Sequence, residues 1–264
     1  MNELLSALSD VAVCAGDIIM EFARKGTNTE HKSDGSPVTE ADRAAELFIR
    51  RKLAELTPDI PIIGEEGMAQ PDAIDALLTE KSFWLVDPLD GTKEFLAGTG
   101  EYTVNIALIE SGIPILGVVY APVKGLLYTG SAEGAYRITR GVKEKLPCYG
   151  REKGRLRFIM SRSHRTGEEE FSGFTDRFEI EKIYMGSSLK FCMVAERSAD
   201  VYIRSGTTMY WDSAAGQAVL KGAGAMLTEL ETGCELCYKD KGLKNPAFIA
   251  TWSDIKKEMT DESK

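Results

Sequence analysis

Two carboxylates follow one apolar run closely enough in the sequence to bind the same cation. Asp87 and Asp90 belong to the hexapeptide Asp-Pro-Leu-Asp-Gly-Thr at residues 87–92. It comes directly after Phe-Trp-Leu-Val at 83–86, which we expect to be a buried strand that ends at Pro88. Like charges about 4 Å apart repel by roughly 4 kcal/mol at an effective dielectric near 20. The turn therefore predicts a hard divalent cation between the acids, such as magnesium, calcium or manganese, with a solvated Asx-type turn as the alternative.

Two further acids stand at the ends of predicted elements. Glu65 lies in Gly-Glu-Glu-Gly behind the short apolar run Ile62-Ile63, and Asp212 lies in Trp-Asp-Ser-Ala-Ala-Gly, where a helix should begin. Asp212 could simply be a helix N-cap, which is worth about 1 kcal/mol. Together with the hexapeptide, however, the chain has three acid-bearing element ends. This pattern predicts a carboxylate metal site of the kind used for phosphoryl chemistry.

The composition is that of an ordinary globular enzyme. The chain has 264 residues, of which 43% are hydrophobic and 28% charged, enough for one large or two fused domains. Its net charge of -9 argues against a nucleic-acid polymer as partner, because binding a phosphate backbone needs a basic surface. A small anionic substrate is still compatible with this net charge if a metal ion and nearby basic residues make the electrostatic potential of the site positive.

The cysteines do not suggest a disulfide framework, because they are odd in number and scattered. Cys-Glu-Leu-Cys at 234–237 lacks the second Cys or His pair of a structural zinc site. The chain shows no signal-peptide pattern and no apolar run near the roughly 20 residues that span a bilayer. We expect a cytoplasmic location, with peripheral association with the inner membrane left open, and a monomer or a homodimer. The cysteines are Cys14, Cys148, Cys192, Cys234 and Cys237.

The first part of the chain should contain two helices and then antiparallel strands. Apolar residues recur at helical spacing from Leu4 to Phe22, and the helix should end near Gly26. A second helix should follow Thr39, which with Asp42 resembles a capping box. Between residues 83 and 138, short apolar runs alternate with glycine turns, so we expect strands and no helix there.

After a polar, basic stretch from about 139 to 155, the pattern becomes mixed. The composition break near residue 145 predicts a boundary between two parts of the chain, residues 1–145 and residues 146–264. Lys-Gly-Ala-Gly-Ala at 221–225 follows a helix, so it indicates a helix end or close packing and not a dinucleotide loop. The expected C-terminal elements are strands at 156–160, 201–203 and 247–250, and helices at 189–195 and after Asp212.

The three acidic motifs, in this order and spacing, resemble the signatures of the lithium-sensitive, magnesium-dependent phosphatases of the inositol monophosphatase superfamily. Within it, residues 84–95, 103–109 and 186–192 are most similar to the bacterial 3'(2'),5'-bisphosphate nucleotidases of the CysQ type. Inositol phosphatases usually have Thr-Asn where this chain has Lys93-Glu94. The resemblance covers essentially the whole chain. It implies a layered αβαβα sandwich. An N-terminal α+β part at residues 1–145 would carry most of the metal ligands, and a C-terminal α/β part at 146–264 would carry Asp212 and the specificity residues. The active site would lie in the cleft between them.

The resemblance also implies roles for residues. Two or more magnesium ions, or manganese as a second suitable ion, would be held by five residues, with Leu89 contributing its carbonyl. Thr92, polarised through Asp42, would orient the attacking water, whereas helix capping is the alternative role for Asp42. The backbone N–H groups of Gly91 and Thr92 would bind phosphate oxygens. The implied metal ligands are Glu65, Asp87, Leu89, Asp90 and Asp212.

Substrate choice is expected to depend on the second part of the chain. Gly-Ser-Ser at 186–188, ahead of a helix, offers N–H groups and hydroxyls for a second phosphate, and Lys190 adds charge. A plain N-cap with a surface lysine is the alternative. By the same resemblance, His164 and Arg204 are candidates for nucleotide contact. The full expected substrate-binding set is Glu65, Leu89, Asp90, Gly91, Thr92, His164, Ser187, Lys190, Arg204 and Asp212.

The implied activity is removal of the 3'-phosphate of adenosine 3',5'-bisphosphate, giving AMP and phosphate. This reaction would clear a by-product of sulfate assimilation. Two alternatives remain at this point. One is a sugar phosphatase acting on inositol monophosphate or fructose 1,6-bisphosphate, and the other is a catalytically idle family member that binds metal and ligand only.

Overall fold

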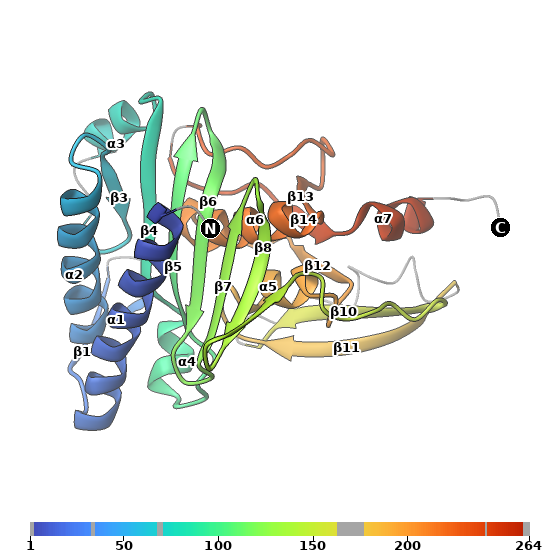
Figure 1. The fold of residues 1–264 in the computed structure, drawn as a ribbon, viewed down its shortest axis with the longest axis horizontal. Coiled ribbons are helices and arrows are strands. Elements are labelled where there is room, and N and C mark those ends of the chain that lie inside the picture. Colours follow the sequence, from blue (N-terminus) through green and yellow to red (C-terminus); the bar gives the residue numbers. More distant parts are fainter. Residues whose placement is uncertain (1–2, 33–34, 68–70, 163–176, 241, 261–264) are drawn as a thin grey trace.

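Helices and sheets alternate in layers. The computed structural model describes residues 3–32, 35–67, 71–162, 177–240 and 242–260. In Figure 1, α1 (Glu3–Lys25) and α2 (Glu40–Leu56) cover one face of a seven-stranded sheet, and α5 (Leu189–Ala195) and α6 (Tyr210–Ala223) lie on its other side. A five-stranded sheet and α7 (Ser253–Thr260) lie beyond them. The predicted layered sandwich is confirmed.

The larger sheet has the order β3-β4-β5-β6-β7-β8-β9, and only the pair β3 and β4 is parallel. The glycine turns predicted between residues 83 and 138 connect its hairpins, near Gly112, Gly125 and Gly134. A small ribbon of β1 (Thr29–His31) and β2 (Pro37–Thr39) precedes α2, and α3 (Pro71–Leu77) follows β3. The sheet strands are β3 (Ile62–Gly64), β4 (Ser82–Asp90), β5 (Thr103–Glu110), β6 (Ile113–Ala121), β7 (Leu126–Ser131), β8 (Gly134–Thr139) and β9 (Val142–Lys145).

Two local predictions in this region were wrong. Strand β4 does not end at Pro88 but runs to Asp90, with an irregular register between Asp87 and Asp90. A proline lacks an N–H group, and a bulge is where a strand accommodates that loss. A short helix, α4 (Thr92–Leu96), follows where no helix was expected. Five residues are too few to produce a helical period in the sequence.

The smaller sheet has the order β11-β10-β12-β14-β13 and contains parallel and antiparallel pairs. The predicted strands and α5 are confirmed. Helix α6 begins before Asp212, and α7 follows the strand that was expected to be the last element. The strands are β10 (Arg155–Ser161), β11 (Glu179–Met185), β12 (Val201–Arg204), β13 (Met226–Glu229) and β14 (Phe248–Thr251).

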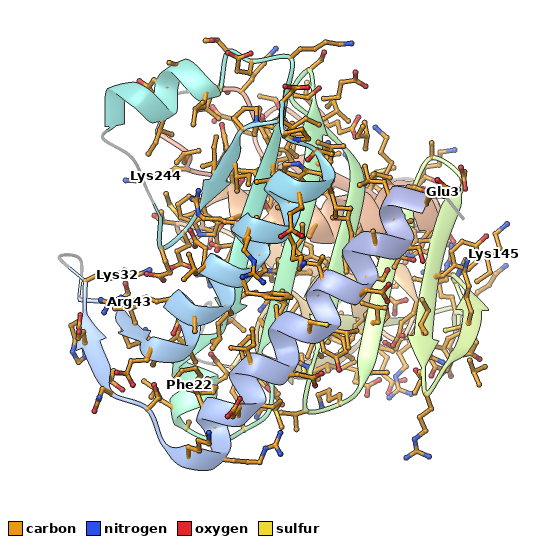
Figure 2. All side chains as sticks on the ribbon, turned by 60° about the vertical axis from the view of Figure 1, so that its left-hand side comes forward. Glu3, Phe22, Lys32, Arg43, Lys145 and Lys244 are labelled. Carbon is orange, nitrogen blue, oxygen red and sulfur yellow. The ribbon has the colours of Figure 1, made fainter. Side chains whose placement is uncertain are left out.

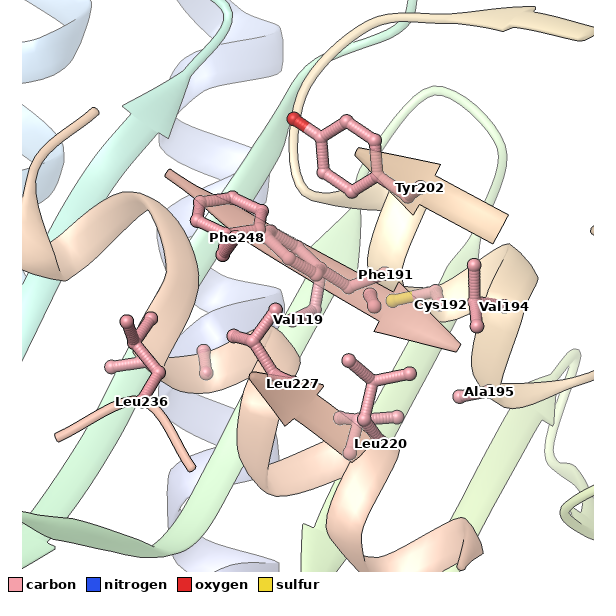
Figure 3. Close-up of a cluster of buried hydrophobic side chains, with 14 of the residues drawn as sticks. Val119, Phe191, Cys192, Val194, Ala195, Tyr202, Leu220, Leu227, Leu236 and Phe248 are labelled. Carbon is pink, nitrogen blue, oxygen red and sulfur yellow. The ribbon is translucent and has the colours of Figure 1, made fainter. Parts of the chain in front are cut away.

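Two apolar clusters hold the layers together. One lies under α1 and α2 and includes Leu8, Ile49 and Trp84, all fully buried. The other fills the space around α5 and α6 and joins residues of both sheets, and Figure 3 shows Phe191 and Phe248 in it. The first sheet ends at Lys145, but the second cluster is common to both parts of the chain. The division into domains at residue 145 therefore stays a prediction.

Helix α6 approaches the seven-stranded sheet very closely through glycines. A Cβ atom at Gly117 on β6 would lie 2.5 Å from the Cβ of Ala218, and one at Gly130 on β7 would overlap the Ala218 carbonyl. Because only glycine leaves this space, the helix that carries Asp212 rests on the strand backbone. We call Gly117, Gly130 and Ala218 the glycine contact.

Two further predictions concern the cysteines and membrane-spanning segments. All five cysteines are free thiols, as expected from their odd number and spacing. Within the described residues, every helix is too short or too polar to cross a bilayer.

Candidate active site

A cleft of about 430 Å³ opens where the end of β4 and the beginnings of α5 and α6 meet. Ten of the predicted site residues line it, so the fold brings together segments that are far apart in the sequence. Asp42 lies behind this lining, and His164 lies outside the described residues. The predicted residues in the lining are Glu65, Asp87, Leu89, Asp90, Gly91, Thr92, Ser187, Lys190, Arg204 and Asp212.

Three aspartates form a compact carboxylate cluster in the cleft. Asp87, Asp90 and Asp212 each place an oxygen atom within 4.8 Å of the others. Burial raises the pKa of all three, and repulsion from neighbouring carboxylates raises it further. Several oxygen ligands and excess negative charge fit a hard divalent cation, which would relieve the repulsion. The resemblance of the motifs to metal-dependent phosphatases implies such an ion, and the chemistry of these residues suits it.

Hydrogen bonds from backbone amides fix two of the aspartates, Asp87 and Asp212. Asp87 Oδ1 accepts a hydrogen bond from the Leu89 N–H at 3.0 Å, within the irregular end of β4. Asp212 is the third residue of α6 and not its N-cap. Its Oδ2 accepts from the Met209 N–H at 2.7 Å, so it also satisfies an amide at the helix start. The capping alternative for Asp212 is thus partly correct, and the same side chain also belongs to the cluster.

Glu65 faces the same cleft but lies outside the three-aspartate cluster. Its carboxylate accepts from Lys32 Nζ at 2.6 Å, and the same ammonium lies 2.6 Å from Glu66 Oε1. Burial acts to lower the pKa of Lys32, but the two glutamates outweigh it and raise that pKa above its usual value. Lys32 therefore supplies positive charge beside Glu65. Sequence reasoning missed this lysine, whose one signal was its place in the polar segment before Thr39.

Asp42 serves two partners with its two oxygens. Oδ2 accepts from the N–H and the hydroxyl of Thr39, at 2.8 and 2.6 Å, which closes the predicted capping box. Oδ1 accepts from the Thr92 hydroxyl at 3.2 Å. That hydroxyl also lies 3.3 Å from the Leu89 carbonyl, and its single hydrogen can serve one of the two at a time. Capping and contact with Thr92 are therefore compatible in one side chain.

Ser188 joins the two sides of the cleft. Its Oγ lies 2.8 Å from Asp90 Oδ2 and 2.8 Å from the Asp212 carbonyl, and it accepts from Asn105 Nδ2 at 2.8 Å. Ser188 is 1% exposed. Its hydroxyl was expected to face a phosphate, and in the structure it contacts Asp90 at the end of β4 and the Asp212 carbonyl of α6. Ser188 also lines the cleft, so its part in a phosphate cradle stays a prediction.

The Gly186 N–H is also occupied. It donates to Glu101 Oε2 at 2.9 Å, and Arg162 holds both oxygens of that carboxylate. Ser187 has a φ angle of 53°, which residues other than glycine seldom adopt. The turn therefore presents Ser187 to the cleft, while Gly186 is held by the N-terminal part of the chain.

Lys190 and Arg204 form the positive side of the cleft. Lys190 is 6% exposed, so it is not the surface lysine of the alternative reading. Its Nζ donates to the Ser187 carbonyl at 2.5 Å and lies 5.3 Å from the centre of the Tyr202 ring. Burial lowers its pKa, although Asp90 acts in the opposite direction. Arg204 is 8% exposed, and its Nε has no hydrogen-bond partner among the described residues.

Comparison with known proteins agrees with the fold and the motifs. The model of the inositol monophosphatase family matches residues 1–261. The 3'(2'),5'-bisphosphate nucleotidase CysQ of Salmonella typhimurium is 42% identical over 251 residues, which cover 94% of this chain and 99% of that protein. The same-named protein of Escherichia coli is 41% identical over 249 residues, covering 93% and 98%.

A solved structure gives the same result. The crystal structure of CysQ from Bacteroides thetaiotaomicron, described as a bacterial member of the inositol monophosphatase family, matches with a TM-score of 0.83 and 35% identity. The match covers 96% of this chain and 98% of that one. Sequence, motifs and fold agree over nearly the full length, and the chain belongs to the inositol monophosphatase family.

Proposed function

We propose that this protein is a magnesium-dependent 3'(2'),5'-bisphosphate nucleotidase that converts adenosine 3',5'-bisphosphate to AMP and phosphate. The observation that carries the proposal is the pairing, in one cleft, of the carboxylate cluster with two buried cations, Lys190 and Arg204. A substrate with two phosphate groups can use both sides at once. The nucleotidases named CysQ, at 41–42% identity over most of this chain, support the same substrate.

The metal ligands in this proposal are Glu65, Asp87, Asp90, Asp212 and the Leu89 carbonyl. When bound there, magnesium would lower the pKa of a ligated water and neutralise charge on the transferring phosphoryl group. The ligands are all oxygens, which suits magnesium first and manganese second. The number of ions, two or more, belongs to the proposal.

Thr92 and Asp42 would orient the attacking water. Thr92 lines the cleft, and when its hydroxyl donates to Asp42 Oδ1, its oxygen would be available to accept a water proton. Water supplies the new oxygen on phosphorus, the bond from phosphorus to the ribose 3'-oxygen breaks, and that oxygen leaves with a proton. The N–H groups of Gly91 and Thr92 would hold the phosphoryl oxygens.

The second phosphate would lie against Lys190, Arg204 and Ser187. An anion there gives the Arg204 Nε a partner and compensates the charge of a lysine that is almost fully buried. His164 remains a candidate for nucleotide contact. The acidic side thus handles the phosphate that is removed, and the basic side holds the one that stays.

The test compares phosphate release from adenosine 3',5'-bisphosphate, inositol 1-phosphate and fructose 1,6-bisphosphate, each with magnesium and with a chelator. We expect the nucleotide to give the highest kcat/KM and the chelator to abolish turnover. A preference for either sugar phosphate would reject the nucleotide assignment. The absence of turnover on all three, with magnesium bound, would favour the idle alternative.

A further inference from the structure

One face of α2 carries three polar residues at a spacing of four, Asp42, Glu46 and Arg50. Side chains with this spacing lie above one another along a helix. Figure 2 looks onto α2 and α1 as they lie across the seven-stranded sheet. Asp42 contacts Thr92, as described above. Glu46 and Arg50 stand outside the cleft lining and contact instead the segment that carries Glu65.

Glu46 and Arg50 hold this segment, residues 62–67, at three backbone positions. Glu46 Oε2 accepts from the Glu66 N–H at 2.7 Å, and its Oε1 accepts from Arg50 Nε at 2.7 Å. The two remaining Arg50 nitrogens donate to the Ile62 carbonyl at 3.3 Å and to the Gly67 carbonyl at 3.1 Å. Glu46 is 3% exposed, so its charge is compensated mainly by these contacts.

These contacts fix the backbone on both sides of Glu65. The Glu65 N–H donates to the Val86 carbonyl at 3.2 Å, one residue before Asp87 on β4. The next N–H, that of Glu66, is the one bound by Glu46. Because both peptides that flank Glu65 are held, its side chain leaves the backbone at a fixed position relative to Asp87.

The side chains of Glu46 and Arg50 pack directly against the backbone of Gly64 and Gly67. A Cβ atom at Gly64 would lie 2.5 Å from Glu46 Oε1. A Cβ atom at Gly67 would lie 2.5 Å from the same oxygen and 2.6 Å from Arg50 Nη2. The two glycines therefore give the carboxylate and the guanidinium the space to reach the backbone between them.

We propose that Glu46 and Arg50 are positioning residues for Glu65, and that through it they set the affinity of the cleft for a divalent cation. The proposal rests on the function proposed above and gives neither residue a contact with substrate. Residues that orient metal ligands in this way commonly change metal affinity by 10- to 100-fold when replaced. A merely structural ion pair would change stability and leave the affinity as it was.

The test is Arg50→Met, which keeps the length of the side chain and removes its donors. Manganese binding to the metal-free protein, measured by calorimetry without substrate, should weaken about 10- to 100-fold. In assays, the magnesium concentration for half-maximal rate should rise while kcat at saturating magnesium stays near that of the wild type. Arg50→Lys, which keeps the charge but not the fork of donors, should bind manganese with intermediate affinity.

The matched control is Arg157→Met. Arg157 and Asp200 form an ion pair whose side chains are 20% and 1% exposed, similar to 29% and 4% for Arg50 and Glu46, but outside the cleft. This variant should lose stability and keep its manganese affinity. Equal weakening in both variants, or unchanged affinity in Arg50→Met, overturns the proposal.

Gly67→Ala disturbs the contacts of Glu46 and Arg50 with the backbone and leaves both charged residues in place. It should displace the Arg50 guanidinium and weaken manganese binding in the same direction. If Arg50→Met does not fold, normal manganese affinity in Gly67→Ala overturns the proposal. A wild-type protein that binds no manganese would instead refute the function proposed above, because the positioning role presupposes a metal site.

Discussion

The two sides of the cleft are built in opposite ways. The acidic side consists of short side chains on rigid backbone, with Asp87 and Asp90 at a strand end and Asp212 in the first turn of a helix. The basic side consists of two long side chains, Lys190 and Arg204, that reach the cleft from α5 and β12. The spacing of the acids is therefore set by the backbone, whereas the positions of the cations depend on side-chain packing.

The difference separates what each side can do. A metal ion requires ligand positions accurate to a few tenths of an ångström, which backbone-fixed acids provide. A phosphate group that is held but not transformed tolerates longer and more adaptable partners. We expect changes to the acidic side to abolish catalysis, and changes to the basic side to alter the choice of substrate.

The largest effect should follow Asp90→Asn. This change keeps the shape of the side chain and removes one charge, so kcat with magnesium should fall by a factor on the order of a hundred or more. The metal-free variant should unfold at the same or a higher temperature, because repulsion from Asp87 and Asp212 is reduced. Steady-state kinetics and thermal unfolding with a chelator measure the two effects. Near-normal turnover would contradict the assignment of the metal to the acidic side.

Lys190→Ala should affect one substrate class. Loss of a charge-assisted contact of about 1.5 to 3 kcal/mol corresponds to a roughly ten- to hundredfold lower kcat/KM on adenosine 3',5'-bisphosphate. A monophosphate substrate lacks the group that Lys190 would bind and should be affected little. Lys93→Ala is the control, because Lys93 lines the same cleft but is exposed. Equal losses on both substrates would mean that Lys190 supports the fold and not the substrate.

Ser188→Ala tests the junction between the two sides. The change removes the buried oxygen shared by Asp90, the Asp212 carbonyl and Asn105, and it leaves the Asn105 Nδ2 without this acceptor. We expect the free energy of unfolding to fall by about 1 to 3 kcal/mol. Denaturant titration in a chelator measures it. Unchanged stability would show that the hydrogen bonds of Ser188 do not hold the two sides together.

The smallest effect concerns pH and Glu66. Burial raises the pKa of Glu66 from its ordinary value of 4.5 to about 7, and Lys32 opposes this. Since the folded pKa is the higher one, this group's stabilising contribution is full below about 4.5 and is lost as the pH rises through about 7. Metal-free protein should therefore lose stability across that window. Glu66→Gln should reduce the loss by the order of 1 kcal/mol, after allowance for solvent screening. Thermal unfolding at several pH values measures the effect. A larger loss of stability in Glu66→Gln than in the wild type would contradict this prediction.

The acidic side could be predicted from sequence because its information is local. Asp87, Asp90 and Thr92 lie within one hexapeptide. Glu65 and Asp212 each lie in a short motif of their own. Residue types, spacing and the ends of predicted elements were enough to place them at one site. The details of β4 and α4 were not predictable in the same way, because a bulge and a five-residue helix leave no periodic pattern.

The basic side was harder to predict because its contacts are distant in sequence. The Gly186 N–H was expected to face a phosphate, but it donates to Glu101, 85 residues earlier. Ser188 likewise bonds Asp90, 98 residues earlier. Lys32 and the Glu46–Arg50 pair were missed for a similar reason, since their partners are known only once α2 lies against the segment after β3.

The glycine contact beneath α6 has a consequence for attempts to redesign this enzyme. A library that varies Ser187, Lys190 and Arg204 changes side chains whose surroundings can rearrange, so many members should remain folded and some should accept new substrates. Any side chain at Gly117 or Gly130 should instead push α6, which carries Asp212, away from the sheet in which β4 carries Asp87 and Asp90. Selection for a new substrate should thus accept many substitutions on the basic side. Variants at Gly117 and Gly130 should instead be lost because they have no activity on any substrate.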